Sequence, residues 1–265
     1  MLYFVATPIG NLKDITYRAV EVLESVDEIG CEDTRHSLSL LNHLNIKKPL
    51  FSYHKFNEKE SVEKIISKLN QGKNIAIISD AGMPCISDPG NILARELKEK
   101  GLEFTVIPGA SAFTSALVLS GLDTDRFAFV GFLPEKKSDR TEVLEKYKNL
   151  DMTLIFYSAP HDVKKDILTL YQVLGDRKAC AVKEITKIHE RAITFNLKDG
   201  LPEEPKGEFV LIVEKAKQTS ENLALSEKEH IEKYIKEGMD KKEALKKVAK
   251  ERGVSKSSLY KYTIE

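Results

Sequence analysis

The sequence predicts two α/β domains followed by a small helical, helix-turn-helix-like domain. Short apolar runs alternate with amphipathic segments through the first two domains, which is typical of β-α units. Apolar residues make up 42% of the 265 residues, enough for a sizeable core. We expect the N-terminal α/β domain over 1–122, the second over 123–217 and the helical domain over 223–265.

The N-terminal domain shows its pattern clearly in the segment Glu60–Gln71, where an apolar stripe at helical spacing ends at Gly72. Further helices are expected after Asp14 or Thr16 and at Ser37–Leu44, Ile92–Lys100 and Ala112–Ser120. Strands are expected at Leu2–Ala6, up to Cys31, and at Asn74–Ser79 and Phe104–Ile107.

The second domain is expected to have a mixed sheet. Its last three strands follow one another closely and lack crossover helices, so they should pair at least partly antiparallel. The expected strands are Phe127–Gly131, Met152–Tyr157, Lys178–Glu184, Ala192–Leu197 and Glu208–Lys215. Helices are expected up to Tyr147 and over Asp162–Leu174, with the domain boundary near Gly121–Arg126.

The C-terminal segment is basic and helical. After a polar linker at 217–222, helices are expected at Ser226–Gly238, Lys241–Glu251 and Ser255–Tyr262. Residues 241–261 carry eight basic and two acidic side chains, a net charge of +6. With Tyr260 and Tyr262 this favours nucleic-acid binding through Lys256 and Lys261. A helical hairpin that serves dimerisation is the alternative.

The bulk composition excludes several classes of protein. The formal net charge is zero, so any nucleic-acid contact must come from a local patch. Three cysteines far apart in the sequence make a disulfide framework or a zinc site improbable, and no metal is expected. No apolar stretch is long enough to span a membrane, and the N-terminus reads as a core strand, so we expect a cytoplasmic protein.

Three loops of small residues follow three predicted strands, at 7–12, 79–90 and 108–112. Ligands of parallel sheets bind beyond the carboxyl ends of the strands, so the loops should converge on one site that includes Asp80 and Gly82. The loops contain neither G-x-G-x-x-G nor a P-loop lysine motif, which argues against NAD and ATP. Within 79–90, Ser87 or Asp88 is expected to cap a helix that has Pro89 at its first position.

Two polar segments are candidates for contacts with phosphate. Glu32-Asp33-Thr34-Arg35-His36 follows a strand, and Arg35 and His36 suit phosphate or ribose; a surface turn with internal ion pairs is the alternative. The loop 131–140 could bind phosphate through Lys136, Lys137 and Arg140, although solvated basic loops look similar. His161, at the end of another strand, is more typical of a structural histidine.

In order along residues 2–214, the chain resembles the 16S rRNA (cytidine-2′-O)-methyltransferases of the tetrapyrrole methylase superfamily. The resemblance is carried by Ala6-Thr7-Pro8-Ile9-Gly10-Asn11-Leu12, Glu32-Asp33-Thr34-Arg35-His36, the 79–90 loop, Gly131-Phe132-Leu133-Pro134 and Gly207-Glu208. The sequence departs from the family pattern in places. Met83 replaces a usual Thr, Ala110 a usual Pro and Phe56 a usual His, and residues 158–162 replace Glu-Ser-Pro-His-Arg.

The resemblance implies a class III methyltransferase-like fold, with S-adenosyl-L-methionine in a cleft between the two α/β domains. The residues implied to surround it are Pro8, Gly10, Asp80, Gly82, Met83, Ala110, Ser111 and Ala112. It further implies small ribosomal subunit 16S rRNA as the partner and a homodimer.

Methyl transfer to a ribose 2′-hydroxyl requires that the hydroxyl lose its proton. The candidate bases are Asp33, Glu32 and Asp88. Lys137, Arg35 and Arg140 would hold the flanking phosphates. Two alternatives are a small-molecule (tetrapyrrole or corrin) methylase and a helix-turn-helix regulator with a ligand-sensing α/β domain.

Overall fold

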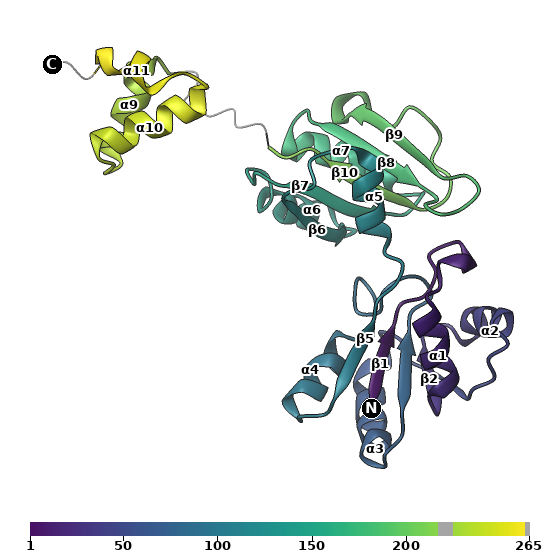
Figure 1. Ribbon diagram of the computed structural model, residues 1–265. Coiled ribbons are helices and arrows are strands. Elements are labelled where there is room, and N and C mark those ends of the chain that lie inside the picture. Colours follow the sequence, from purple (N-terminus) through teal and green to yellow (C-terminus); the bar gives the residue numbers. More distant parts are fainter. Residues whose placement is uncertain (217–224, 263–265) are drawn as a thin grey trace. The chain divides into compact units, whose positions relative to one another are not determined.

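A computed structural model describes residues 1–216 and 225–262 (Figure 1). Two compact units make up the chain. The larger one holds both β-sheets, and the smaller one holds the C-terminal helices. The linker expected at 217–222 lies outside the described residues.

The first sheet of the larger unit is parallel throughout, with the strand order β3-β2-β4-β1-β5. Its strands are β1 (Leu2–Val5), β2 (Glu28–Cys31), β3 (Leu50–Ser52), β4 (Ile75–Ile78) and β5 (Phe104–Ile107). β3 was missed in the sequence, since three residues give too little alternation to detect.

Helices cover both faces of this sheet, as expected for a doubly wound fold. They are α1 (Tyr17–Ser25), α2 (Thr34–His43), α3 (Glu58–Asn70) and α4 (Asn91–Glu99), with the 3₁₀ turn η1 (Leu12–Asp14) before α1. The apolar stripes of α1 and α2 pack in one core, and those of α3 and α4 in another. α1 begins at Thr16, whose hydroxyl accepts the backbone N–H of Ala19 at 3.1 Å.

The second sheet is mixed, with the order β6-β7-β10-β8-β9. β6 and β7 pair in parallel and the remaining pairs are antiparallel, which confirms the expectation from the short connections. Its strands are β6 (Phe127–Phe132), β7 (Thr153–Ser158), β8 (Lys178–Lys183), β9 (Arg191–Asn196) and β10 (Phe209–Val213). Its helices are α6 (Lys137–Glu145) and α7 (Val163–Leu174), with the 3₁₀ turn η2 (Leu197–Asp199) after β9.

The chain passes from the first sheet to the second earlier than the sequence suggested. Helix α5 (Ala112–Ser120) buries Ala116 and Leu117 against Val182 and Val210 of the second sheet, and Figure 1 shows it beside β8 and β10. The boundary expected at 121–126 is therefore corrected to the loop between β5 and α5. The apolar face of α5 belongs with the second sheet, a tertiary preference that helix periodicity does not reveal.

The start of α4 also differs from the prediction. Gly90, and not Ser87 or Asp88, is the N-cap residue, and Pro89 lies before the helix. Gly90 has φ +133° and approaches Cys85 so closely that a Cβ would lie 2.5 Å from the sulfur. Its N–H donates to the carboxylate of Glu58 at 2.8 Å, so Glu58 satisfies the N–H of the N-cap residue, as the N3 carboxylate does in a capping box.

The smaller unit contains the three expected helices, α9 (Glu227–Lys236), α10 (Lys241–Arg252) and α11 (Lys256–Leu259). Gly253 ends α10 at φ +65°, and the Ser255 hydroxyl accepts the Ser258 N–H to begin α11, at the residue where the third helix was expected to start. α11 is short and continues as a 3₁₀ turn, η3 (Tyr260–Tyr262). A small apolar core joins the helices.

Candidate active site

Backbone hydrogen bonds tie two of the strand-end loops together. Thr7 and Gly82 form an isolated antiparallel bridge, with N–H to carbonyl distances of 2.9 and 3.1 Å. The third loop lies beside them, because a Cβ on Gly82 would come 3.7 Å from the carbonyl oxygen of Ala110. The predicted convergence of the three loops is therefore present, and Gly82 stands at their meeting point.

A cavity of about 480 Å³ opens at this meeting point. Its volume falls in the range typical of small-molecule sites. One part of its lining comes from the first sheet and its loops, another from α5 and the second sheet. The lining includes Ile9, Glu32, Asp80, Gly82, Met83, Asp88, Ser111, Ala112, Tyr157, Ser158, Val182, Ile185, Glu208 and Val210.

The backbone is strained on both sides of the cavity. Among the described residues, five that are not glycine have positive φ, and four of them lie in the segments 85–87 and 184–186. Thr186 has φ +65°, which is unusual for a β-branched residue. Strain that collects beside a cavity is typical of functional sites, because the surrounding fold must stabilise it.

Three carboxylates, Glu32, Asp80 and Asp88, line the first-sheet side of the cavity. Burial and the neighbouring Asp80 carboxylate raise the pKa of Glu32. Burial, together with Glu32, raises the pKa of Asp88 to about 6, although a hydrogen bond from Ser79 opposes the shift. A carboxyl group with a pKa near 6 can exchange a proton at neutral pH, which suits it to general acid-base chemistry.

Buried hydrogen bonds fix the loop that carries Asp88. The carboxylate of Glu58 accepts both the N–H of Gly90 at 2.8 Å and the Tyr53 hydroxyl at 2.9 Å. Tyr53 and Glu58 are themselves buried. Glu58 therefore anchors the end of the loop only two residues beyond Asp88.

Several of the other predicted site residues do not line the main cavity. Pro8 and Gly10 line a second, smaller cavity that also includes Asp80. Ala110 is not among the lining residues. Asp33 is outside the cavity as well: its carboxylate caps α2 and pairs with Arg35, which lowers its pKa to about 2. A carboxylate held in this way is poorly suited to accept a proton, so Asp33 is corrected to a capping residue.

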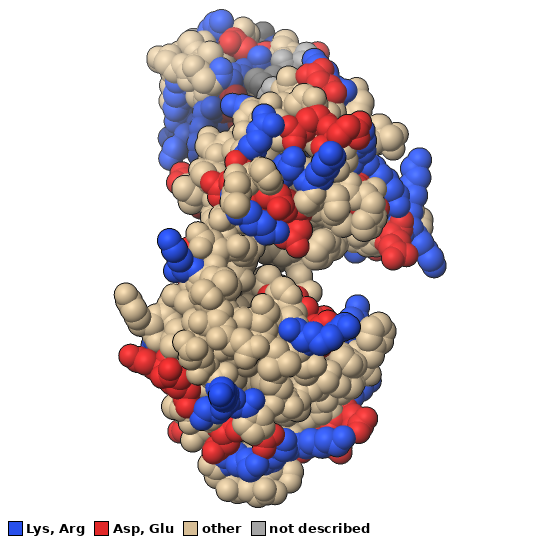
Figure 2. Space-filling model, turned by 90° about the vertical axis from the view of Figure 1, so that its right-hand side faces the viewer, with Lys and Arg blue, Asp and Glu red and all other residues tan. Residues whose placement is uncertain are grey.

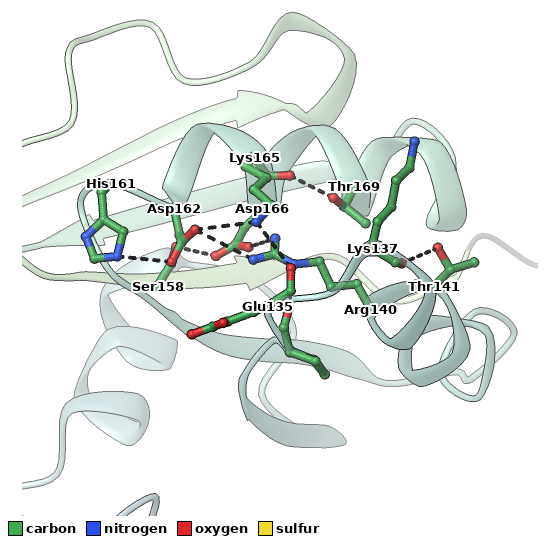
Figure 3. Close-up of polar contacts among 11 residues, drawn as sticks. Glu135, Lys137, Arg140, Thr141, Ser158, His161, Asp162, Lys165, Asp166 and Thr169 are labelled. Carbon is green, nitrogen blue, oxygen red and sulfur yellow. Dashed lines mark hydrogen bonds and ion pairs between the residues drawn. The ribbon is translucent and has the colours of Figure 1, made fainter.

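Arg140 was predicted to bind phosphate, and this prediction is wrong (Figure 3). Its side chain is only 2% exposed, and its guanidinium pairs with the buried Asp166 and donates to the carbonyl of Pro134. Asp166 also accepts the hydroxyl of Ser158, which lines the cavity. Arg140 is therefore a structural cation rather than an RNA contact, whereas Lys137 is exposed and points away from the pair.

Sequence reasoning missed most of the second-sheet wall. Tyr157, Val182, Ile185 and Val210 are apolar or aromatic residues within strands or directly after them, where they look like ordinary core residues. Glu208 could have been found, because Gly207-Glu208 is among the motifs that carry the family resemblance. A Cβ on Gly207 would lie 2.4 Å from the carboxylate of Glu184, so only glycine fits beside that strained turn.

The residues present suit S-adenosyl-L-methionine. Aliphatic side chains give an apolar surface for a flat ring, and the carboxylates suit a positively charged sulfonium group.

Among residues 1–216 and 225–262, no group of His, Cys, Asp and Glu is arranged to hold a metal ion. No helix within those residues has the length and apolar character needed to cross a membrane.

Residues 1–199 match the sequence model of the tetrapyrrole (corrin/porphyrin) methylases, and the chain belongs to this family. With the two-sheet fold and this cavity, the family match identifies a methyltransferase that uses S-adenosyl-L-methionine as methyl donor. A crystal structure of diphthine synthase has the same fold, with a TM-score of 0.66 and 17% identity over 81% of this chain and 89% of that one.

Among curated proteins, the chain is similar to Ribosomal RNA small subunit methyltransferase I of Halalkalibacterium halodurans. The two are 43% identical over 98% of this chain and 93% of that protein. The protein of the same name from Mycoplasmopsis pulmonis is 46% identical over 80% of this chain and 96% of its own length. About a fifth of this chain therefore has no counterpart in that relative.

Proposed function

We propose that this enzyme methylates a cytidine ribose 2′-hydroxyl in the 16S rRNA of the small ribosomal subunit, in the cytoplasm. Relatives that match nearly the whole chain carry the name Ribosomal RNA small subunit methyltransferase I. The observation that carries the chemistry is the half-buried Asp88, whose pKa is raised to about 6 beside the cavity. The resemblance of the 32–36 and 79–90 motifs supports the choice of ribose.

S-adenosyl-L-methionine supplies an electrophilic methyl group at a sulfonium centre. Asp88 accepts the proton that the ribose hydroxyl loses, with Glu32 as its neighbour. Asp80, Gly82, Met83, Ser111 and Ala112 position the donor, and the aliphatic wall of the second sheet keeps water from the reacting atoms.

Exposed basic residues outside the cavity serve the RNA. Arg35, His36 and Lys137 are exposed on the larger unit, and on the face shown in Figure 2 charges of both signs lie interspersed. Lys256 and Lys261 extend the contact from the smaller unit, where each lies near a tyrosine ring. The helical unit aids RNA binding rather than the chemistry, because every residue that lines the main cavity lies in the larger unit.

The enzyme is further proposed to be a homodimer. Helix α5 exposes Val118 and Leu119 on the side away from its packed face, with Val118 73% exposed. Exposed aliphatic side chains of this kind are typical of a protein interface. Val118→Glu should convert the dimer to a monomer in analytical ultracentrifugation, and a wild-type monomer would refute the assembly.

The test of the proposed function is the transfer of labelled methyl from S-adenosyl-L-methionine. Label should enter ribose in 30S subunits from cells that lack the enzyme, and not a porphyrinoid. Label in the porphyrinoid alone would favour the second candidate, a tetrapyrrole methylase, which rests on the family name and the fold.

Asp80→Ala tests the cofactor site. It should abolish binding of S-adenosyl-L-methionine in calorimetry, because Asp80 lines the cavity and also accepts the N–H of Asp33 at 3.2 Å. Undiminished affinity would show that the donor binds elsewhere.

Removal of residues 223–265 should weaken RNA binding about tenfold and leave cofactor affinity unchanged.

A further inference from the structure

A smaller cavity of about 180 Å³ lies next to the main one, at the N-terminal end of α2. Its lining includes Pro8, Leu12, His36, Ser37, Leu40 and Asp80. The volume is well below that of the main cavity and below the range typical of drug-sized ligands. It suits a single ring rather than the whole methyl donor.

Asp80 connects the two cavities, because it belongs to the lining of both. A group bound in the smaller cavity and one bound in the larger cavity would both adjoin the Asp80 residue. This is the arrangement that a transfer reaction needs, with donor and acceptor held next to each other.

Ser37 gives the smaller cavity an unused polar group. It is 2% exposed, and its hydroxyl has no conventional hydrogen-bond partner within the described residues. The Ser37 hydroxyl does interact with the Cys31 thiol, an interaction that lowers the pKa of the thiol, but sulfur is only a weak acceptor. A buried hydroxyl without a partner is rare in folded proteins and is readily explained by a ligand that satisfies it.

The rest of the lining suits a flat heteroaromatic ring. Pro8, Leu12 and Leu40 provide apolar surface, and the His36 imidazole can stack on a base. Leu12 is 42% exposed and His36 is exposed, so both lie at the mouth of the cavity. The exposed guanidinium of the adjacent Arg35 is suitably placed for a phosphate outside it.

We propose that the smaller cavity receives the pyrimidine base of the acceptor nucleotide, turned out of the RNA. The Ser37 hydroxyl hydrogen-bonds the edge of the base, and the ribose lies at Asp80, between the two cavities. The inference rests on the proposed function and adds the site that selects the nucleotide. Enzymes that do chemistry on a base bind it turned out of the stack, and a pocket for the base beside the reacting ribose would use the same conformation for selection.

Ser37→Ala tests the hydrogen bond, since it removes one oxygen without adding bulk. We expect kcat/KM for 30S subunits to fall about tenfold, with the affinity for S-adenosyl-L-methionine and the melting temperature unchanged. An unchanged kcat/KM would overturn the proposal. A parallel loss of cofactor affinity would also overturn it, because the cavity would then belong to the donor site.

Leu12→Trp tests the cavity as a whole by filling its exposed mouth. This variant should lose at least a hundredfold in kcat/KM for 30S subunits while it still binds the cofactor. Leu38→Trp is the matched control, because Leu38 is 46% exposed on α2 and is not part of the lining.

The two proposals fail in different ways. If the wild-type enzyme methylates 30S ribose and both cavity variants match it, the proposed function stands and the base-binding site falls. If the wild type does not methylate 30S subunits, the proposed function fails, and the base-binding inference fails with it.

Discussion

Two carboxylates, the half-buried Asp88 beside the first sheet and the buried Asp166 on α7 beside the second, differ in their partners. Burial raises the pKa of both. Asp166 pairs with the guanidinium of Arg140 and accepts the Ser158 hydroxyl. Asp88 has a hydrogen bond from Ser79, and its charged neighbours are the carboxylates Glu32 and Asp80.

The difference shows how one side-chain type serves two purposes. Arginine stays protonated under all ordinary conditions, so it compensates the charge of Asp166 and makes that carboxylate part of the architecture. The carboxylates around Asp88 instead favour its neutral form, so it can gain and lose a proton near neutral pH. Four predictions test this contrast, from the largest expected effect to the smallest.

Asp88→Asn should cause the largest loss. It removes the proton acceptor, so kcat should fall about 10²–10⁴-fold while cofactor affinity changes little. In the wild type, kcat/KM should rise with pH and level off above about 6, where Asp88 is ionised. Single-turnover methyl transfer measures both. Asp139→Asn, a change at an exposed residue of α6, is the control, and equal activity of the two variants would exclude Asp88 as the base.

Arg140→Ala should destabilise the protein by about 3–5 kcal/mol, because Asp166 would be left buried without its cation. Urea unfolding measures the loss. The double variant Arg140→Met, Asp166→Leu removes both charges and should recover most of the stability. If the single and double variants were equally unstable, lost packing rather than an unpaired charge would be the cause.

The free energy of unfolding should depend on pH differently in the wild type and in Asp88→Asn, which has a neutral side chain at this position. Its pKa rises from 3.8 to about 6 on folding, so the native state binds the proton more tightly. The associated stability is fully present below about pH 4 and is lost as pH rises through about 6. The free energy of unfolding of Asp88→Asn should therefore exceed that of the wild type by on the order of 2 kcal/mol at pH 8, and by little at pH 3. A constant difference across this range would contradict the raised pKa.

Tyr53→Phe should have the smallest effect. It removes one of the two hydrogen bonds to Glu58 but keeps the Gly90 N–H in place. We expect a loss of about 1 kcal/mol in stability and a two- to fivefold fall in kcat, as the Asp88 loop loosens. The exposed Tyr17→Phe is the control. A kcat identical to wild type would show that the hydrogen bond from the Gly90 N–H to Glu58 is enough to hold the loop in place.

The sequence predicted the regular parts of the structure well. The two sheets, the mixed character of the second one, the three C-terminal helices and the convergence of the strand-end loops all follow from local patterns. Periodicity, turn residues and caps act within a few residues of each other. They can therefore be detected in a single chain.

What escaped prediction depends on long-range contacts. The sheet that α5 packs against, the Glu58 anchor of the 79–90 loop and the burial of Arg140 each join segments far apart in sequence. Arg140 looked like an exposed cation because it lies among lysines. Its partner Asp166 is 26 residues away and gives no local signal.

The order of strands in the first sheet has a consequence for synthesis on the ribosome. β1 is the first strand to be made, yet it lies between β4 and β5, whose last residue is Ile107. One edge of the apolar N-terminal segment therefore stays unpaired until β4 is complete at Ile78, and the other until β5 is complete at Ile107, when more than a third of the polypeptide has been translated. A nascent chain that pauses earlier should expose this segment to chaperones or to aggregation.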